Sequence, residues 1–473
     1  MIPKISKIAE LKENTSTAII LDEQKQYSFP GFSENEKKYL KQKLVKNNDC
    51  VLNSYPNLFF FFKPKNEKEN YIEMEEARKA GAKFFDILKT EKINSVQLLD
   101  FSQAKYGFAF IEGLLLSTYT FDKYKKEKEE FDLKEIFLVD SKISESEIEE
   151  LSNLTQAVFY ARTLVNEPLS FLTATQFAKE MEAMAKDAGF TIEVFGKQKI
   201  ESLKMGGLLA VNKGSIDPPT FSILEWKPEN AKNSKPVVLV GKGVVFDTGG
   251  LSLKPTPKSM DYMKCDMAGA AVVAATVYAL AKNKVPVHVI GLIPATDNRP
   301  DGNAYAPGDI ITMYDGTTVE IKNTDAEGRL LLADALSYAK KYDPKLVIDV
   351  ATLTGAAVIV AAKHAMIVMG NSQENISKLK ETGFETFERL IEVPLWDEYA
   401  EPLKSPIADL NNLGTREAQS TIAGKFLEHF TDYQWIHLDS ADTPFFDTKD
   451  AYRPAGGTGF GTRLLYNFLK KIN

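Results

Sequence analysis

The feature that most limits the fold is an alternation of apolar strands with helices in the second half of the chain. Runs rich in branched apolar residues at 236–240, 287–292 and 345–350 are separated by helical patterns at 268–282 and 330–341. Apolar runs without a polar face are typical of strands that are buried on both sides of a sheet. This order predicts a mostly parallel sheet flanked by helices.

Residues 1–145 predict a smaller N-terminal α/β domain. Its mixed-charge run at 123–130 is typical of a solvated loop. A helical pattern from 146 ends at Pro168, because proline restricts the residue before it and stops a helix. We therefore expect a linker helix at 146–168 and a larger catalytic domain at 169–473. In the first domain we expect strands at 16–21, 58–62, 96–99 and 136–139. We expect helices there at 71–90 and 103–117.

Composition excludes several classes of protein. A chain of 473 residues suggests two or three domains, and a net charge of -7 argues against a broad nucleic-acid footprint. Cys50 and Cys265 lie far apart, so neither a disulfide framework nor a thiolate zinc site is expected. The N-terminus lacks the apolar core of a secretion signal, and no later run approaches the roughly 20 apolar residues of a membrane span. We expect a cytoplasmic protein without a membrane segment.

Three polar clusters, at 241–250, 260–267 and 323–329, follow or join the predicted strands. Ligands of open α/β sheets bind at the carboxyl ends of the strands, so these clusters are candidates for a site. The glycines around Lys242 resemble a phosphate loop, but the spacing of a Walker motif is missing. Asp266 precedes a helix of small residues and has an alternative role as its N-cap.

The cluster at 323–329 holds two carboxylates, a glycine and an arginine within one turn. Asp325 and Glu327 are two residues apart, so in an extended segment both side chains point the same way. Gly328 would let the backbone turn sharply without steric cost. Two convergent acids favour a bound cation, whereas the alternative is an acidic helix start that complements the helix dipole.

Together these motifs resemble the leucyl aminopeptidase family of di-metal peptidases, also called the cytosol aminopeptidases. The resemblance extends from about residue 150 to the C-terminus. It rests on Asn-Thr-Asp-Ala-Glu-Gly-Arg-Leu at 323–330, Gly-Lys-Gly-x-x-Phe-Asp-x-Gly-Gly at 241–250, Ser-x-Lys at 252–254, Met-x-x-Asp-Met at 263–267 and Ala-Thr-Leu-Thr-Gly at 351–355.

The resemblance implies a metal-dependent aminopeptidase that removes the N-terminal residue from peptides with a free N-terminus. Four carboxylates balance the charge of two divalent cations. Lys242, the implied lysine ligand, must be neutral to bind a metal. Asp247 and Glu327 are the implied shared ligands. The ligands of two metal ions per subunit would be Lys242, Asp247, Asp266, Asp325 and Glu327.

The resemblance also implies the mechanism. A hydroxide activated by both metals attacks the scissile carbonyl, and the Lys254 ammonium stabilises the developing oxyanion. Arg329 holds a bicarbonate ion that acts as a candidate general base, since a guanidinium suits planar anions. Thr352, Leu353 and Gly355 would position substrate through main-chain groups, and Met263 would line the pocket. The alternatives are core packing for Met263 and a simple strand-end turn at 354–355.

The resemblance implies a homohexamer, with zinc or manganese as the metal. None of the four histidines has a metal-ligand spacing, so a site rich in oxygen ligands also admits magnesium or cobalt. We expect structural roles for His288, His364, His429 and His437.

The chain departs from the family pattern at Ser170, at 418–419 and at Asp442, and none of these positions is an implied metal ligand. The departures affect the expected pocket walls and local packing. Two other functions stay open at this point. One is a DNA-binding regulator, against which the acidic charge counts, and the other is a two-metal phosphoesterase.

Overall fold

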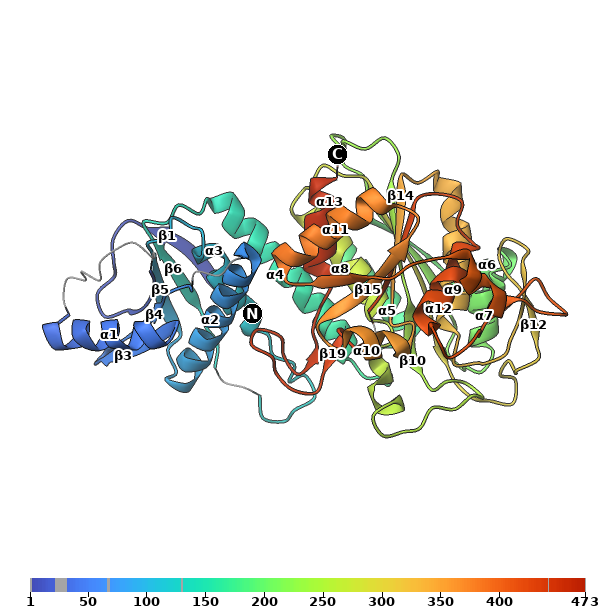
Figure 1. Cartoon of the computed structure of the whole chain (residues 1–473), viewed down its shortest axis with the longest axis horizontal. Helices are drawn as coiled ribbons and strands as arrows, with labels where there is room; N and C mark the ends of the chain where they lie inside the picture. Colours follow the sequence, from blue (N-terminus) through green and yellow to red (C-terminus); the bar gives the residue numbers. More distant parts are fainter. Residues whose placement is uncertain (1, 22–31, 66–68, 129–130, 441, 473) are drawn as a thin grey trace. The chain divides into compact units, whose positions relative to one another are not determined.

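The computed structural model describes residues 2–21, 32–65, 69–128, 131–440 and 442–472 (Figure 1). The chain divides into two compact units, Met1–Gln156 with Thr448–Pro454, and Ala157–Asp447 with Ala455–Asn473. The division falls inside helix α4 (Glu145–Asn166). The functional boundaries expected at 145 and 168 stay a prediction.

The first unit holds a six-stranded sheet in the order β1-β6-β5-β2-β4-β3, in which only the pairing of β3 with β4 is antiparallel among the described strands. Helices α2 and α3 pack so closely that a Cβ on Gly113 would lie 1.9 Å from the carbonyl oxygen of Arg78. The elements are β1 (Lys4–Ile8), β2 (Ser16–Ile20), α1 (Glu34–Lys46), β3 (Asp49–Ser54), β4 (Asn57–Phe62), α2 (Asn70–Thr90), β5 (Ser95–Asp100), α3 (Gly107–Ser117) and β6 (Glu135–Val139).

The sequence patterns missed β1, α1 and β3, and they placed the start of α3 four residues too early. Asp100 accepts hydrogen bonds from the backbone N–H groups of Ser102 and Ala104, which holds this segment in a turn before the helix. The expected loop at 123–130 has no helix or strand through residue 128, and residues 129–130 lie outside the described residues.

The second unit is built on a nine-stranded sheet in the order β16-β15-β18-β14-β9-β11-β8-β7, with β10 paired to β11. Its central strands β18, β14, β9 and β11 run parallel, which confirms the mostly parallel sheet. The strands are β7 (Thr191–Phe195), β8 (Thr220–Trp226), β9 (Val237–Gly241), β10 (Gly243–Asp247), β11 (Val289–Asn298), β14 (Leu346–Ala351), β15 (Ala365–Gly370), β16 (Arg389–Glu392) and β18 (Trp435–Asp439).

Helices cover both faces of this sheet. Gly291 of β11 faces α8, since a Cβ there would lie 3.2 Å from a methyl group of Val273, whereas its neighbours Ile290 and Leu292 join the cluster around α9. The helices are α5 (Ala174–Ala188), α6 (Lys197–Ser202), α7 (Gly206–Asn212), η1 (Met260–Cys265), α8 (Ala268–Lys282), α9 (Gly328–Ala339), η2 (Lys340–Tyr342), α10 (Gly355–Ala361), α11 (Gln373–Thr386), η3 (Asp397–Leu403), α12 (Gln419–Glu428) and α13 (Thr462–Lys471).

Two small sheets complete the unit. One has the order β12-β13-β17, and the other pairs β19 with β20. Their strands are β12 (Ile310–Thr312), β13 (Thr318–Glu320), β17 (Leu410–Asn411), β19 (Phe445–Phe446) and β20 (Gly456–Gly457).

The stretch Met260–Lys282, which comprises η1 and α8, is long and apolar enough to cross a membrane by length and composition. However, 89% of its most apolar window is buried inside the protein. Packing of α8 against β9, β14, β11 and β8 accounts for this apolar character.

Candidate metal centre

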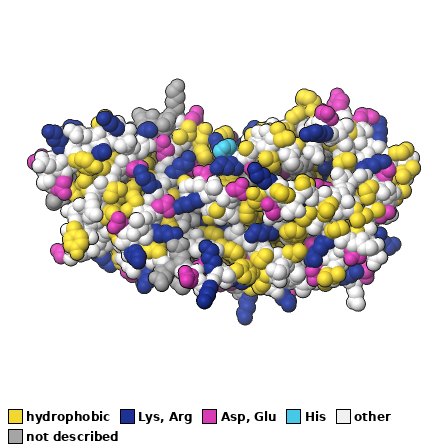
Figure 2. All heavy atoms as spheres, turned by 90° about the horizontal axis from the view of Figure 1, so that it is seen from below, with side chains coloured by type: hydrophobic (Ala, Val, Ile, Leu, Met, Phe, Trp, Pro, Cys, Tyr) yellow, Lys and Arg dark blue, Asp and Glu magenta, His cyan; other side chains and the backbone are white. Residues whose placement is uncertain are grey.

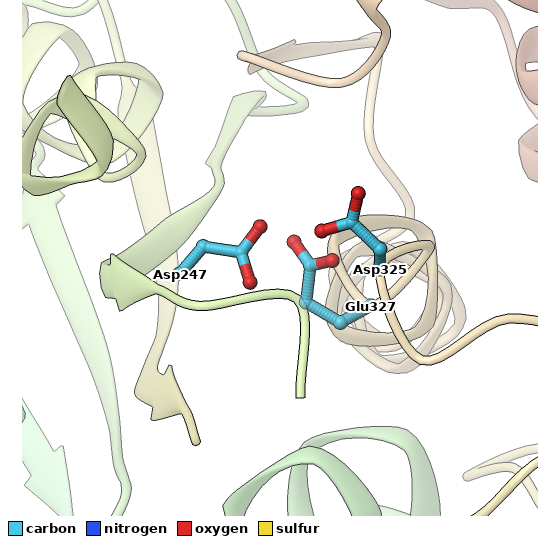
Figure 3. A group of neighbouring side chains, drawn as sticks. All are labelled: Asp247, Asp325 and Glu327. Carbon is cyan, nitrogen blue, oxygen red and sulfur yellow. The ribbon is translucent and has the colours of Figure 1, made fainter. Parts of the chain in front are cut away.

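Three carboxylates meet at the ends of different elements in the second unit. Asp247 is the last residue of β10, whereas Asp325 and Glu327 lie in the turn before α9. Figure 3 shows the three side chains pointing toward one another. One oxygen of each lies within 4.8 Å of the others, a spacing that allows a shared cation.

Lys242 and Asp266 extend this cluster on its buried side. The Lys242 Nζ lies 2.8 Å from Asp266 Oδ1 and 2.8 Å from Glu327 Oε1, and it donates a hydrogen bond to the Thr352 carbonyl at 2.8 Å. Lys242 is only 3% exposed, so its amine is not in contact with bulk solvent. Burial lowers its pKa, but Asp266 and Glu327 raise it more, so the net pKa lies above the usual range.

Lys254 lies on the open side of the cluster. Its Nζ is 3.0 Å from Asp247 Oδ2 and 2.5 Å from Asp325 Oδ1. The side chain of Lys254 is 15% exposed and that of Asp325 is 30% exposed, more than the buried side chains of the cluster. Burial lowers the pKa of Lys254, but the facing carboxylates raise it above its usual value. The ammonium form is therefore favoured.

The acids repel one another. Burial and neighbouring carboxylates raise the pKa of Asp247 and Asp266, and they raise the pKa of Asp325 to about 7. Burial also acts to raise the pKa of Glu327, but Lys242 and Lys254 outweigh this effect, so the net pKa is lowered. Four carboxylates against two ammonium groups leave a net charge of about -2 when all six are ionised.

The donor set fits divalent cations. Asp266 Oδ2 is buried and has no hydrogen-bond partner among the described residues. A buried carboxylate oxygen without a partner is costly, and a cation would satisfy it while it balances the excess negative charge. Carboxylates with one amine and no thiolate or histidine form an oxygen-rich site, which suits several divalent metals.

Asn298 supports the cluster, although the sequence patterns did not identify it. Its Nδ2 donates to Asp247 Oδ1 at 2.8 Å and to the Thr324 carbonyl at 2.9 Å. The backbone N–H of Gly249 donates to the same Asp247 oxygen at 2.8 Å. A signal was present, because the apolar strand β11 ends in three polar residues, 296–298.

The acidic turn differs from the expected one. Residues 323–326 form a turn and not an extended segment, with the Ala326 N–H bonded to the Asn323 carbonyl. Gly328 has no left-handed φ, so it is not needed to turn the chain. A Cβ on Gly328 would instead lie 2.5 Å from Lys242 Cε and 2.8 Å from its Nζ. The glycine makes room for the buried lysine.

The structure also decides two alternatives for the other clusters. Met267, not Asp266, occupies the N-cap position of α8, and no side-chain hydrogen bond caps this helix. Asp266 Oδ1 accepts from the Lys242 Nζ and from Thr352 Oγ1, so its carboxylate faces the cluster. The glycine-rich segment forms β9 and β10 with Lys242 between them, and it is no phosphate loop.

Arg329 is buried beside the cluster. Its Nη1 donates one long hydrogen bond of 3.4 Å to the Leu413 carbonyl, and its Nε has no hydrogen-bond partner in the described part of the chain. The guanidinium carbon lies 5.8 Å from the centre of the Phe426 ring. Burial lowers the pKa of Arg329 to about 10. A buried cation with an unused donor suits a small anion.

The expected substrate segment follows β14. Thr352 contacts Lys242 and Asp266. Gly355 is exposed at the start of α10. The Leu353 N–H donates to Asp439 Oδ1 at 3.1 Å, so this donor is already used, and sequence patterns had not identified Asp439. Met263 is half-buried in η1, which leads to Asp266.

The histidines lie outside the cluster of carboxylates and lysines. His288 Nε2 lies 2.8 Å from Glu225 Oε1, and His437 Nδ1 lies 2.6 Å from Asp349 Oδ1. His437 is in β18, and His288 directly precedes β11.

The chain is similar to known proteins. The family model described as "Cytosol aminopeptidase family, catalytic domain" matches residues 159–466. A protein of Chlorobium limicola named "Probable cytosol aminopeptidase" is 46% identical over 425 residues, which cover 83% of this chain and 83% of that protein.

Two solved structures are similar along nearly the whole chain. The bottromycin maturation enzyme BotP in complex with Mn is 30% identical, has a TM-score of 0.86, and the match covers 97% of this chain and 99% of that chain. A mutant of tomato leucine aminopeptidase is 24% identical, with a TM-score of 0.87 and coverage of 99% and 97%. At that identity the second likeness shows the fold alone.

Proposed function

The chain belongs to the cytosol aminopeptidase family, and from this premise we propose that its acidic cluster is the metal centre of the enzyme. As a member of the family, the chain is a leucyl-type metal-dependent aminopeptidase that acts on peptides. The family does not favour the two alternatives, a DNA-binding regulator and a two-metal phosphoesterase. On the face that Figure 2 shows, basic and acidic side chains are interspersed, which also speaks against a DNA-binding surface there.

The observation that carries the proposal is the convergence of four carboxylates and one buried lysine, with Asp266 Oδ2 left without a partner. Asp247 and Glu327 each raise the pKa of both Asp266 and Asp325, and we propose that these two carboxylates would serve as ligands to both ions. The residues that would hold two divalent ions are Asp247, Asp266, Asp325, Glu327 and, once a bound ion has displaced the proton that its acidic neighbours favour, Lys242. The bound ions would acidify a water molecule and polarise the scissile carbonyl.

Lys254 provides the second function of the site. It is a partly exposed ammonium whose Nζ lies beside Asp247 and Asp325, at the open side of the cluster. An ammonium at this place stabilises negative charge that develops on the carbonyl oxygen during attack, and it does so most strongly where water is excluded. We propose that Lys254 binds the oxyanion.

Arg329 is proposed to hold the proton acceptor. Its guanidinium is buried, its Nε is unused among the described residues, and it directly follows the turn that carries the acids. A planar anion such as bicarbonate matches the fork of a guanidinium. Bicarbonate is therefore the proposed general base.

The main chain at 352–355 is proposed to position the substrate. Because Asp439 uses the Leu353 N–H, we assign substrate binding to the Leu353 carbonyl and to the Gly355 N–H. Gly355 begins α10, where the first N–H groups have no acceptor within the helix, and a Cβ there would meet no atom within 4 Å. Met263 is proposed to line the pocket for the first side chain.

Three further properties belong to the proposal. We propose zinc or manganese as the metal, with magnesium or cobalt as alternatives, because the donor set has no strong preference and BotP was solved with Mn. We propose a homohexamer and a cytoplasmic location. We also propose the functional division into an N-terminal domain at 1–145, a linker helix at 146–168 and a catalytic domain at 169–473.

The test is a substrate panel. Chelated protein is supplied with each divalent metal and assayed on anilides of different amino acids, on an N-acetylated anilide, on a phosphate monoester and for binding to duplex DNA at two salt concentrations. We expect metal-dependent release of the free amino acid only from substrates with a free amine. Equal hydrolysis of the N-acetylated anilide, or faster hydrolysis of the phosphate ester, would overturn the proposed function.

A further inference from the structure

A line of buried charged side chains lies behind the substrate segment. In the register of β14 and β18, Asp349 pairs with His437 and Ala351 pairs with Asp439. Paired residues point to the same face of a sheet, and so do residues two apart in one strand. Asp349, His437 and Asp439 therefore share one face, and each is at most 1% exposed.

His437 is held on one side only. Its Nδ1 lies 2.6 Å from Asp349 Oδ1, and the other Asp349 oxygen accepts from Trp435 Nε1 at 2.7 Å. His437 Nε2 is buried and has no hydrogen-bond partner in the described part of the chain. Burial lowers the pKa of His437, whereas Asp349 and Asp439 raise it, and Arg329 opposes them; the net pKa is raised.

Asp439 connects this line to the site. Its Oδ1 accepts from the backbone N–H groups of Leu353 and Thr354 at 3.1 and 3.4 Å, and its Oδ2 accepts from Thr354 Oγ1 at 2.6 Å. The Thr354 Oγ1 also lies 2.6 Å from Ser420 Oγ. One residue earlier, the Thr352 carbonyl accepts from Lys242. Asp439 thus fixes the main chain directly beside a proposed metal ligand.

We propose that His437, held by Asp349, is a positioning residue that keeps Asp439 bonded to the main chain of Leu353 and Thr354 and so sets the place of the substrate segment. The inference rests on the proposed function of that segment. A purely structural role explains the line poorly, because a buried ion pair contributes little to stability compared with apolar side chains of similar volume. Burial raises the pKa of Asp439, and an imidazolium at His437 opposes this rise. His437 thereby favours the carboxylate, the form that accepts all three hydrogen bonds.

The test is a double-mutant cycle on the metal-loaded protein. His437→Asn keeps an N–H donor for Asp349 but removes the charge, and Thr354→Val removes the hydroxyl that Asp439 binds. For His437→Asn we expect kcat/KM on an amino-acid anilide to fall about 10- to 100-fold, the range for residues that orient a site from behind, mostly through KM and with unchanged metal content. The double variant should lose less than the product of the two single losses, since both changes act through Asp439.

His288→Asn is the matched control. The His288 ring also lies beside a carboxylate, with its Nε2 2.8 Å from Glu225 Oε1. However, His288 directly precedes β11, and the residue of this strand that contacts the site, Asn298, is at the opposite end. His288→Asn should leave kcat and KM unchanged. If His437→Asn does not fold, Asp349→Asn replaces it in the same cycle.

Two results would overturn the positioning role: wild-type kcat and KM in a folded His437→Asn protein, or fully multiplicative losses in the cycle. Glu327→Ala in the same assay separates this failure from that of the proposed site. If Glu327→Ala keeps its activity, the proposed metal centre is wrong and the inference falls with it. If Glu327→Ala is inactive and His437→Asn is unaffected, only the positioning role is wrong.

Discussion

At the scale of single residues, two lysines of the site differ in what surrounds them. Lys242 is enclosed by Asp266, Glu327 and the Thr352 carbonyl, whereas Lys254 faces Asp247 and Asp325 where the cluster is partly exposed. The enclosed amine is placed to contact ions held by the acids. The partly exposed ammonium is placed to contact a substrate. This difference in surroundings makes their roles separable by mutation.

Lys254→Ala should lower kcat by about 10²- to 10³-fold, the usual cost of losing one group that stabilises an oxyanion. Metal content should change little, because the proposed metal ligands remain. Steady-state kinetics and elemental analysis of the same sample measure both quantities. The control is Lys258→Ala, which changes an exposed lysine in the same segment between β10 and η1. Wild-type turnover in Lys254→Ala would contradict the assignment.

Gly328→Ala should separate activity from stability. The new Cβ would lie within 3 Å of Lys242 Cε and Nζ, so the lysine must leave its place among the acids. The same change favours the helix, since alanine loses less backbone entropy than glycine. We expect a melting temperature equal to or above that of the wild type, with loss of most activity. Gly302→Ala, where a Cβ meets no atom within 4 Å, controls for the added methyl group. An active Gly328→Ala protein would contradict the proposed place of Lys242.

Asp325 should make metal binding depend on pH. Its pKa is raised to about 7 by burial and by Asp247 and Glu327, so below pH 7 a proton must leave before the carboxylate can bind a metal. Metal affinity should therefore fall as the pH falls, more steeply below about 7 than above it. Calorimetric titration between pH 6 and 8, in buffers of different ionisation enthalpy, measures the affinity and the protons released. Affinity that does not change with pH would contradict a metal ligand of raised pKa at Asp325.

Some single-residue roles were predictable and others were not. The proposed ligands lie in contiguous motifs, where residue type and spacing are visible in the sequence. The roles of Asn298 and Asp439 depend on strand register, which brings distant parts of the chain together. Asn298 bonds to Asp247, 51 positions away, and Asp439 bonds to Leu353, 86 positions away. Gly328 was assigned the wrong role, because a sequence does not show which side chain packs against a glycine.

At the scale of elements, helix α8 brings Asp266 to the sheet. Small residues permit this approach, since a Cβ on Gly241 of β9 would lie 2.4 Å from the Ala270 Cα, and a Cβ on Gly269 would lie 2.0 Å from the Val350 carbonyl oxygen. The start of α8 therefore touches β9 and β14 at backbone distance. Asp266, just before the helix, depends on this contact for its position.

Gly269→Ala should move α8 away from β14. The obstacle is a backbone atom, which cannot rotate away, so we expect a loss of about 1 to 3 kcal/mol in the free energy of unfolding, typical of overpacking. Metal affinity should fall as well, because Asp266 moves with the helix. Denaturant unfolding and metal titration check the two effects, with Gly196→Ala as a control in open space. Wild-type stability together with wild-type metal affinity would refute the close packing.

The patterns predicted long buried elements well and short polar ones poorly. Strands β9 and β14 and helices α8 and α9 were found within a few residues of their bounds, because they are strongly apolar. Helix α1 buries only Leu40 and Leu44, and most of strand β1 is exposed or half-buried, so neither has a clear apolar face. Tertiary packing, which a local pattern does not contain, determines such elements.

At the scale of the whole molecule, the proposed centre joins parts of the second unit that are distant in sequence. Lys242 lies between β9 and β10, and Asp247 ends β10. Asp266 lies between η1 and α8, and the other two carboxylates lie in the turn before α9. Metal binding should therefore stabilise the folded unit as well as activate it. Any ion that binds only the folded state raises stability by about 2.7 kcal/mol at a concentration 100 times its dissociation constant.

The most direct test is a metal back-titration of chelated protein, with hydrolysis of an amino-acid anilide measured after each addition. We expect no activity without metal, a rise that saturates at two equivalents per subunit, and no activity at any metal concentration for Glu327→Ala. Full turnover by the chelated protein, saturation at one equivalent, or wild-type activity of Glu327→Ala would contradict a two-metal centre at these residues.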